Sequence, residues 1–453
     1  MPLGTCGNSN GPAKRSAAFL PAAHGQPAYR RVAMTTDVTG ESDLDQPLDE
    51  SQLDRLIGDG LAGLDLGGKR VLVIIPDGTR NAPMPQIYRS LYELLGESVA
   101  ALDYLIALGT HPPMSEEAIA SLVGMDAQER ATRTSRSQVF NHEWHHPEAL
   151  VHVGTIDVLT MGEITDGLVT KETPIHINGR FRDYDHLFVV GPVFPHEAAG
   201  FSGGAKYLFP GIAGPDIINS VHWMGALATS SVAMGVKDTA VRRMLHRAAE
   251  FVLAERPITL LALVMDGKET HGLYVGNLFD AWEAAADAST QLNIEFVDRP
   301  FQSVLSVPSA MYGDLWTAAK ATYKTEPIVA DGGEVIIYAP QLTEISSVHG
   351  ELIREVGYHV RDYFVNQWDR FEHLPWAILA HSTHVKGLGE YNDGVEYPRI
   401  TVSLATGIPE ELCREVNLGY RDPARINPDE WRDAEGRFLV EEAGELLYRL
   451  GSG

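Results

Sequence analysis

One stretch of the chain gathers more reactive side chains than an ordinary connecting loop contains. Residues 191–206 read Gly-Pro-Val-Phe-Pro-His-Glu-Ala-Ala-Gly-Phe-Ser-Gly-Gly-Ala-Lys and follow an apolar run, 186–190, which predicts a buried strand. A glycine-rich turn after a strand leaves backbone N–H groups free to face a phosphate or another anion. The turn also carries a histidine suited to proton transfer, a hydroxyl beside two glycines, and a lysine that can bind phosphate or form a covalent link. These residues are His196, Ser202, Gly203, Gly204 and Lys206.

Two earlier turns carry related chemistry. Residues 77–80, Asp-Gly-Thr-Arg, follow the apolar run 70–75 and supply a carboxylate for a hydroxyl or amide and a guanidinium for a carboxylate or phosphate. A Gly-Thr-His-Pro turn follows a second run, 103–108, and its imidazole can act as a general base near neutral pH. Ligands of open α/β sheets bind beyond the carboxyl ends of the strands. The residues expected to share one site at these strand ends are Asp77, Arg80, His111 and His196.

Three further features of the sequence are possible sites. His222 lies on a helix expected to begin near Pro215, where it can bind a metal or simply pack in the core. Lys320 lies on a later helix with no motif around it. A histidine cluster suggests zinc, but it lacks the His-Glu-x-x-His order of a zincin helix. The members of that cluster are His142, His145 and His146.

Composition narrows the class of protein. The chain has 453 residues, enough for two or three domains, and 36 basic against 61 acidic residues give it a formal net charge of −25. This balance argues against nucleic acid or an anionic membrane as the main partner. Cys6 and Cys413 are the only cysteines, so a disulfide framework is not expected and a cytoplasmic location fits. No apolar run approaches the roughly 20 residues that a membrane-spanning helix needs.

The hydrophobic pattern predicts an α/β fold. Residues 1–45 are expected to be a disordered tail, residues 46–298 an α/β domain that carries the reactive turns, and residues 299–453 a second α/β domain. Strands are predicted at 70–75, 103–108, 186–190, 258–265, 293–297, 303–307, 334–338 and 376–380. Helices are predicted at 85–101, 241–252 and 316–323. Three more are predicted: one that Ser115 caps, one that begins near residue 215 and one that ends at residue 288.

These motifs, in this order and spacing, resemble the nickel-dependent lactate racemase family. The resemblance extends from about residue 70 to the final helices, and the Ser-Gly-Gly-x-Lys segment is its most specific part. It implies two α/β domains with the active site in the cleft between them, and final helices that pack back on the first domain. The matching residues are Asp77, Gly78, Thr79, Arg80, His111, His196, Ser202, Gly203, Gly204, Lys206, His222 and Lys320.

The resemblance also implies a cofactor. In such a protein Lys206 would carry a nickel pincer nucleotide, a modified pyridinium mononucleotide that holds nickel through a ring carbon and two sulfurs, by a covalent thioamide link. His222 would be the protein's nickel ligand. Separate maturation proteins would make and load the cofactor. The residues expected to help bind it are Asp77, Gly78, Thr79, Ser202, Gly203 and Gly204.

By the same resemblance the reaction would be the racemisation or epimerisation of a 2-hydroxy acid. His111 and His196 would flank the substrate, one taking the hydroxyl proton while hydride passes from C2 to the cofactor. Return of the hydride to the other face of the planar 2-keto acid would invert the centre. Arg80 and Lys320 would bind the substrate carboxylate. No side chain here is a strong enough base for an unactivated C–H bond, so a cofactor must perform this step.

The chain departs from the family pattern in two places. Trp316-Thr317 stands where Tyr-Gln is typical, on a helix expected to line the side-chain end of the substrate, and therefore the identity of the acid is left open. Ala205 stands where a basic residue often precedes the lysine. Two alternatives remain. A dehydrogenase of the NAD type is disfavoured because no Gly-x-Gly-x-x-Gly follows a first strand. A non-catalytic nickel- or nucleotide-binding protein would use His222 and the histidine cluster.

Overall fold

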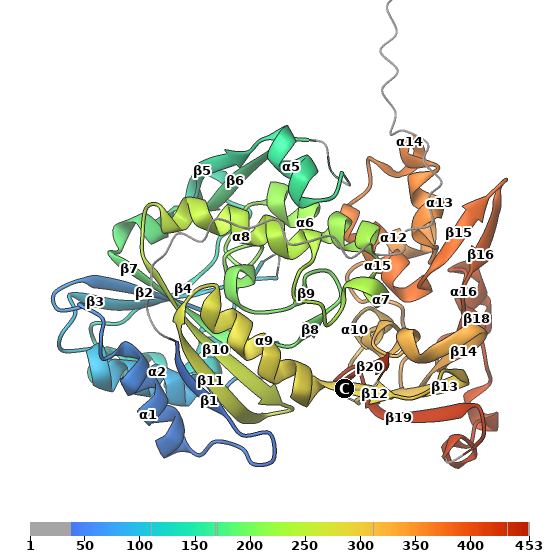
Figure 1. The fold of residues 1–453 in the computed structure, drawn as a ribbon, viewed down its shortest axis with the longest axis horizontal. Helices are drawn as coiled ribbons and strands as arrows, with labels where there is room; N and C mark the ends of the chain where they lie inside the picture. Colours follow the sequence, from blue (N-terminus) through green and yellow to red (C-terminus); the bar gives the residue numbers. More distant parts are fainter. Residues whose placement is uncertain are drawn as a thin grey trace, which may run out of the picture. The chain divides into compact units, whose positions relative to one another are not determined.

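The computed structural model describes residues 38–109, 111–167, 169, 171–310, 312–432 and 434–451, and of His222 it describes the backbone alone. A seven-stranded sheet occupies the first part of the chain (Figure 1). Its strands follow the order β1 (Thr39–Ser42), β11 (Glu269–Asn277), β10 (Ile258–Asp266), β7 (His186–Pro192), β2 (Arg70–Ile75), β3 (Ala101–Ile106) and β4 (Val139–Asn141). The strands from β10 to β4 run parallel, whereas β11 and β1 are antiparallel to their neighbours.

Helices cover both faces of this sheet, which explains why its strands are continuous apolar runs. In β2, Val71, Val73 and Ile75 pack on one face and Leu72 and Ile74 on the other. The first face is covered by α1 (Glu50–Leu61), α2 (Met84–Leu95) and α3 (Glu116–Val123). The second is covered by α8 (Ala240–Leu253) and α9 (Asp280–Asn293). This alternation follows from the period of two along a strand.

Helix boundaries follow local capping chemistry. The prediction that Ser115 caps a helix is confirmed, because its hydroxyl accepts a hydrogen bond from the Ala118 N–H at 3.3 Å. Asp49 and Gln52 form a capping box at the start of α1. The helix predicted at 85–101 ends earlier, at Leu95, because β3 begins at Ala101.

Shorter elements follow between the main strands. They are α4 (Ala127–Arg133), β5 (Leu150–Ile156), α5 (Val158–Ile164), β6 (Thr173–Asn178), α6 (Pro215–Ala228) and α7 (Ser230–Ala233). Strands β5 and β6 pair with each other in antiparallel fashion. Helix α6 begins at the predicted Pro215 and carries His222.

A second sheet has five strands, all parallel. Their order is β18 (Gly419–Tyr420), β17 (Thr401–Thr406), β14 (Val329–Ala339), β13 (Phe301–Pro308) and β19 (Arg437–Ala443). The helices of this part are α10 (Leu315–Ala318), α11 (Lys320–Tyr323), α12 (Gly350–Val356), α13 (Arg361–Val365), α14 (Trp368–Phe371), α15 (Trp376–Lys386) and α16 (Glu410–Glu415). Two small sheets pair β15 (Gly389–Asn392) with β16 (Val395–Pro398) and β12 (Ile294–Val297) with β20 (Leu447–Leu450). Helix α15 packs against α6.

The predicted α/β class is confirmed, and two local predictions are corrected. Residues 376–380, predicted as a strand, begin helix α15. Strand β1 lies inside the segment 1–45 that was expected to be a tail, because it pairs with β11. Strand β11 itself was not predicted. Residues 1–37 lie outside the described part, and the division into two domains stays a prediction. In the part of the chain that the structure describes, no helix combines the length and the apolar character needed to cross a membrane.

Candidate active site

The turns after β2 and β3 bring Asp77 and His111 together. The two strands are neighbours in the sheet, and Nδ1 of His111 lies 2.5 Å from Oδ2 of Asp77. Asp77 is only 6% exposed, and its other oxygen accepts hydrogen bonds from the Thr79 N–H at 3.1 Å and the Thr79 hydroxyl at 2.6 Å. Burial acts to raise the pKa of Asp77, but the hydrogen bonds from His111 and Thr79 outweigh it and lower that pKa. Thr110 lies outside the described residues.

This pair defines how His111 can act. An ionised carboxylate accepts the Nδ1–H, so the neutral ring keeps Nε2 as its basic atom. The His111 side chain is 53% exposed, which leaves the ring accessible to a substrate. Sequence reasoning assigned Asp77 and Thr79 to the cofactor and did not foresee the dyad. In the structure the Asp77 carboxylate is engaged by His111 and Thr79, and the contact it makes is to a candidate catalytic base.

His196 is held in a different way. It lies in a hairpin of β8 (Pro195–His196) and β9 (Gly200–Phe201) that follows β7, and it is 9% exposed. Its Nδ1 accepts a hydrogen bond from the Ala198 N–H at 3.1 Å, and Oε2 of Glu197 lies 3.5 Å from the same atom. A neutral ring that accepts at Nδ1 carries its proton at Nε2. His111 and His196 therefore present opposite tautomers, one oriented by a carboxylate and the other by the main chain.

A buried arginine that sequence reasoning missed shapes the glycine-rich turn. The guanidinium of Arg242 donates to the carbonyl oxygens of Phe201, Ser202 at 3.3 Å and Gly203 at 3.2 Å. It lies 4.2 Å from the centroid of the Trp282 ring, and Arg242 is 2% exposed. Burial lowers its pKa to about 9. The sequence does carry a signal for it, because Arg242 lies on the same face of α8 as the buried residues Leu245 and Ala249, three and seven positions later.

We expect replacement of Arg242 by methionine to destabilise the fold. The change removes the donor that the three carbonyl groups share, although the Ser202 carbonyl still accepts from Nε1–H of Trp282 at 2.9 Å and the Gly203 carbonyl from the Lys206 N–H at 3.2 Å. We expect the free energy of unfolding to fall by about 1–3 kcal/mol. Arg247 on the same helix pairs with Glu250 near the surface, so its replacement by methionine should cost about 0.5 kcal/mol or less. Urea denaturation of both variants measures the difference. Equal stabilities for the two variants would contradict the role given to Arg242.

The hydroxyl of Ser202 and the two glycines after it shape the same turn. The Ser202 hydroxyl donates to the Pro192 carbonyl and accepts from the Phe194 N–H, both at 3.0 Å. Gly203 and Gly204 have φ of 73° and 57°, and a Cβ at either position would lie within 3 Å of a neighbouring side chain. The Ser202 hydroxyl is thus bonded within the turn, and its part in binding the cofactor stays a prediction. The glycines are required by the backbone path of this turn.

Lys206 follows this turn on a short 3₁₀ helix, 204–207. Burial and the neighbouring charge of Arg80 lower the pKa of Lys206 to about 8, although the carboxylate of Glu197 acts in the opposite direction. The Gly211 N–H donates to the Lys206 carbonyl at 3.2 Å, and the Gly211 carbonyl accepts from the Gly109 N–H at 2.8 Å. The lysine turn is therefore linked by hydrogen bonds to the turn that carries His111.

Lys320 joins the same group of charges from the second sheet's part of the chain. Burial is the largest cause that lowers its pKa, followed by the charge of Arg80, while Glu197 and Glu445 act to raise it. The guanidinium of Arg80 lies 5.6 Å from the centroid of the Phe194 ring. Arg80 thus acts on both Lys206 and Lys320. The structure brings these basic groups, predicted from distant motifs, into one electrostatic neighbourhood.

Trp316 and Thr317 lie just before Lys320. The Trp316 ring stacks on His381, with centroids 3.8 Å apart and planes 16° from parallel, and its centroid lies 4.6 Å from that of His349. The Thr317 hydroxyl and N–H both bond to Oδ1 of Asp314, at 2.8 and 3.0 Å, and so cap α10. The Thr317 hydroxyl thus belongs to the helix cap, and the expected contact of Thr317 with substrate stays a prediction.

The predicted metal residues are only partly described. His222 lies on α6, and its side chain is outside the description. His142 is fully buried, with Nε2 3.1 Å from the Ala213 carbonyl and Nδ1 3.1 Å from the Asn178 amide, and burial lowers its pKa to about 4. Among the described side chains, no group of three His, Cys, Asp or Glu is arranged to hold a metal. His142 is therefore a structural residue, which leaves the histidine-cluster site without support.

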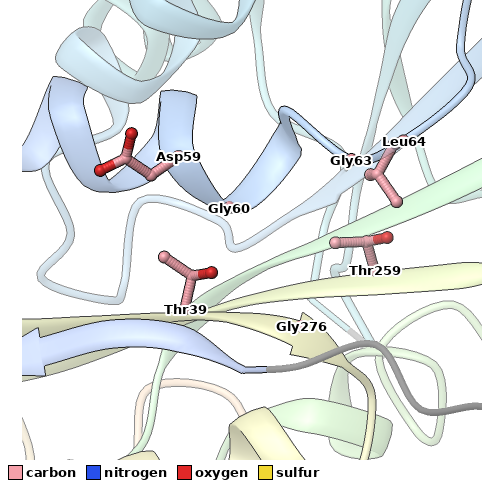
Figure 2. A pocket seen from close by; sticks show the side chains of 7 residues that line it. All are labelled: Thr39, Asp59, Gly60, Gly63, Leu64, Thr259 and Gly276. Carbon is pink, nitrogen blue, oxygen red and sulfur yellow. The ribbon is translucent and has the colours of Figure 1, made fainter.

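A separate cavity lies away from these groups. It measures about 200 Å³ and lies between the end of α1 and the edge of the first sheet (Figure 2). Thr259 in its wall is at the amino end of β10, whereas Asp77, His111 and His196 follow the carboxyl ends of the parallel strands. It therefore lies at the opposite end of the sheet from the candidate site. Its lining residues are Thr39, Asp59, Gly60, Gly63, Leu64, Thr259 and Gly276.

Comparison with known proteins identifies the family. Residues 36–235 match the lactate racemase N-terminal domain. The chain belongs to the lactate racemase family. The match includes every predicted site residue of the first sheet's part and ends before Trp316, Thr317 and Lys320.

Three known proteins are similar to this chain. The lactate racemase of Lactiplantibacillus plantarum is 26% identical over 302 residues, which cover 64% of this chain and 65% of that protein. A crystal structure of a Thermotoga maritima protein is 32% identical, has a TM-score of 0.80, and covers 91% of this chain and 100% of that one. The lactate racemase apoprotein of Thermoanaerobacterium thermosaccharolyticum has a TM-score of 0.66 at 18% identity and covers 90% of this chain and 91% of that one. At that identity the last likeness concerns the fold.

Proposed function

We propose that this family member is a racemase or epimerase of a 2-hydroxy acid and carries a nickel pincer nucleotide on Lys206. The observation that supports this most strongly is the Asp77–His111 dyad on a turn that is hydrogen-bonded to the Lys206 turn, with the charge of Arg80 acting on both Lys206 and Lys320. A general base, a lysine with lowered pKa and two cations are the groups that this reaction requires of the protein.

The residues present fit such a cofactor. A pKa of about 8 for Lys206 makes a neutral, nucleophilic amine far more abundant near neutral pH than an ordinary lysine provides. His222 would be the nickel ligand on α6, and the bound group would accept a hydride from the substrate's C2 and return it.

The chain's own residues would then bind, orient and transfer protons. Nε2 of His111 takes the proton of the substrate hydroxyl, and Asp77 stabilises the resulting imidazolium. Nε2–H of His196 donates to the same substrate oxygen from the other face. Arg80 and Lys320 hold the carboxylate, which fixes C2 between the two rings. The opposite tautomers would suit the two histidines to a reaction that must run in both directions.

The experiment is coexpression with the cofactor maturation proteins, followed by intact mass, metal analysis and a screen of enantiopure 2-hydroxy acids by chiral chromatography. We expect a nucleotide-sized adduct on Lys206, about one nickel per chain, and interconversion of at least one acid. We also expect the loaded protein in the cytoplasm. Adduct and nickel without any racemisation would favour a nickel- or nucleotide-binding protein instead. Their absence, under conditions that load a known racemase, would remove the cofactor from the proposal.

Trp316 is expected to select the substrate's side chain. Its ring packs against His349 and His381, and it is bulkier than the tyrosine typical of the family. We compare lactate with a 2-hydroxy acid whose side chain is two carbons longer. Replacing Trp316 by tyrosine should change the ratio of their kcat/KM values by about tenfold, because a methylene group in a pocket is worth about 1–3 kcal/mol. Steady-state kinetics with both acids measures the ratio. An unchanged ratio would show that Trp316 does not line the pocket.

A further inference from the structure

We propose that the turn between β19 and β20, residues 444–446, is a wall of the substrate site, and that Glu445 is a positioning residue for Lys320. The inference rests on the proposed function, in which Lys320 holds the substrate carboxylate. Neither the motifs of the sequence nor the family match to residues 36–235 reaches this turn. Its connection to Lys320 is made by three sets of contacts.

The first contact runs through an aromatic ring. The Tyr312 hydroxyl donates to Oε1 of Glu445 at 3.0 Å, and Nζ of Lys320 lies 5.5 Å from the centroid of the Tyr312 ring. An ammonium group over the face of a phenol is attracted by the ring's quadrupole. The hydrogen bond to Glu445 fixes the orientation of the ring. Glu445 thereby fixes the surface on which the Lys320 ammonium rests.

The second set ties the turn to α11 itself. Nζ of Lys324, one helical turn beyond Lys320, donates to the Glu445 carbonyl at 2.5 Å. Lys324 is 6% exposed, and its carbonyl accepts from the Tyr448 N–H of β20 at 2.9 Å. Hydrogen bonds therefore connect the two segments on both sides of the turn. The short helix that carries Lys320 cannot shift without breaking them.

The third contact is a close approach of the main chain. Gly444 has φ of 105°, and a Cβ at this position would lie 3.2 Å from the Tyr312 hydroxyl oxygen and 3.3 Å from Cβ of Lys320. The turn therefore lies directly against Lys320, and the position requires glycine both for its backbone angle and for the space. Glu445 follows at once, so its charge acts on Lys320 and opposes the effect of Arg80.

Kinetics tests the inference in the cofactor-loaded enzyme. Tyr312→Phe removes the hydroxyl and keeps the ring, Glu445→Gln removes the charge and keeps an acceptor, and Glu442→Gln makes the same charge change in an exposed side chain nearby. With the acid that the wild type racemises best, we expect the first two to raise KM by about 5–20-fold with kcat within about threefold. Glu442→Gln should match the wild type. A KM unchanged in the first two variants would overturn the inference.

A second measurement does not depend on racemase activity. Reductive ¹³C-methylation of the apoprotein and an NMR titration report each lysine, and the Lys320 resonance is the one lost in Lys320→Arg. Because Glu445 raises the pKa of Lys320, Glu445→Gln should lower its titration midpoint, and Glu442→Gln should leave it unchanged. An unshifted midpoint in Glu445→Gln would overturn the contact. If the wild type racemised no acid, the proposed function would fail, and the titration would still decide whether Glu445 acts on Lys320.

Discussion

Replacement of His111 by asparagine is expected to lower kcat of the cofactor-loaded enzyme by about 10²–10⁴-fold, the usual contribution of a general base. Asparagine retains a polar group near Asp77 but has no basic nitrogen to take the hydroxyl proton. KM should change much less, because in the proposed function Arg80 and Lys320 bind the carboxylate. Initial rates with each enantiomer, measured separately, give both parameters.

One control variant and one variant of the dyad accompany this test. His146→Asn alters an exposed histidine and should leave kcat within about twofold, as expected for a surface substitution. Asp77→Asn should lower kcat less than His111→Asn does, because the base remains but loses its orienting carboxylate. The dyad also affects folding. Because folding lowers the pKa of Asp77, its ionised form stabilises the fold above about pH 4. This contribution to the free energy of unfolding is lost as the pH falls through the lowered pKa. A His111→Asn enzyme with kcat within tenfold of wild type would contradict the assignment of the base.

Replacement of Lys206 by arginine should abolish loading altogether. Arginine keeps a positive charge beside Glu197, but its guanidinium stays protonated and cannot form the amide-like link. At pH 8 about half of the Lys206 side chains are neutral, against well under 1% for an ordinary lysine. We therefore expect Lys206→Arg protein to show the unmodified mass, to lack bound nickel and to have no measurable turnover.

The control for this variant is Lys268→Arg, an exposed lysine in the turn between β10 and β11. It should acquire the adduct and nickel as the wild type does when both proteins are coexpressed with the maturation proteins. An adduct of full size on the Lys206→Arg protein, found by peptide mapping on another residue, would show that the cofactor is attached elsewhere.

The strands of the first sheet were the most predictable part of the fold. Arg70–Ile75 matches its prediction because a strand covered on both faces is apolar at every position. The same signal failed at 376–380, where helix α15 begins with an apolar run and is buried on every side from Ile378 to Lys386, so its sequence shows no helical period. Strand β11 was missed because Gly272 and Gly276 interrupt its pattern, and the structure shows that both allow close approach of residues near β1.

The site was predictable where its chemistry is local. Asp77, His111 and His196 follow strand ends, and parallel neighbours place such ends together. The partners of these groups were not predictable from motifs. Arg242 reaches the glycine-rich turn from a helix some forty positions later, and Tyr312 and Glu445 are 133 residues apart in the sequence. Pairings of this kind depend on the tertiary fold and leave no spacing signal in one sequence.

The order of strands in the first sheet has a consequence for any attempt to isolate the family segment. Residues 36–235 match the family, yet β10 and β11 follow at 258–277 and lie between β7 and β1. A fragment cut at residue 235 would leave β1 without its neighbour, turn β7 into an open edge and remove α8 and α9 from one face. Open hydrophobic edges pair between molecules. We expect such a fragment to aggregate on expression. The segment that matches the family is therefore shorter than the unit that folds.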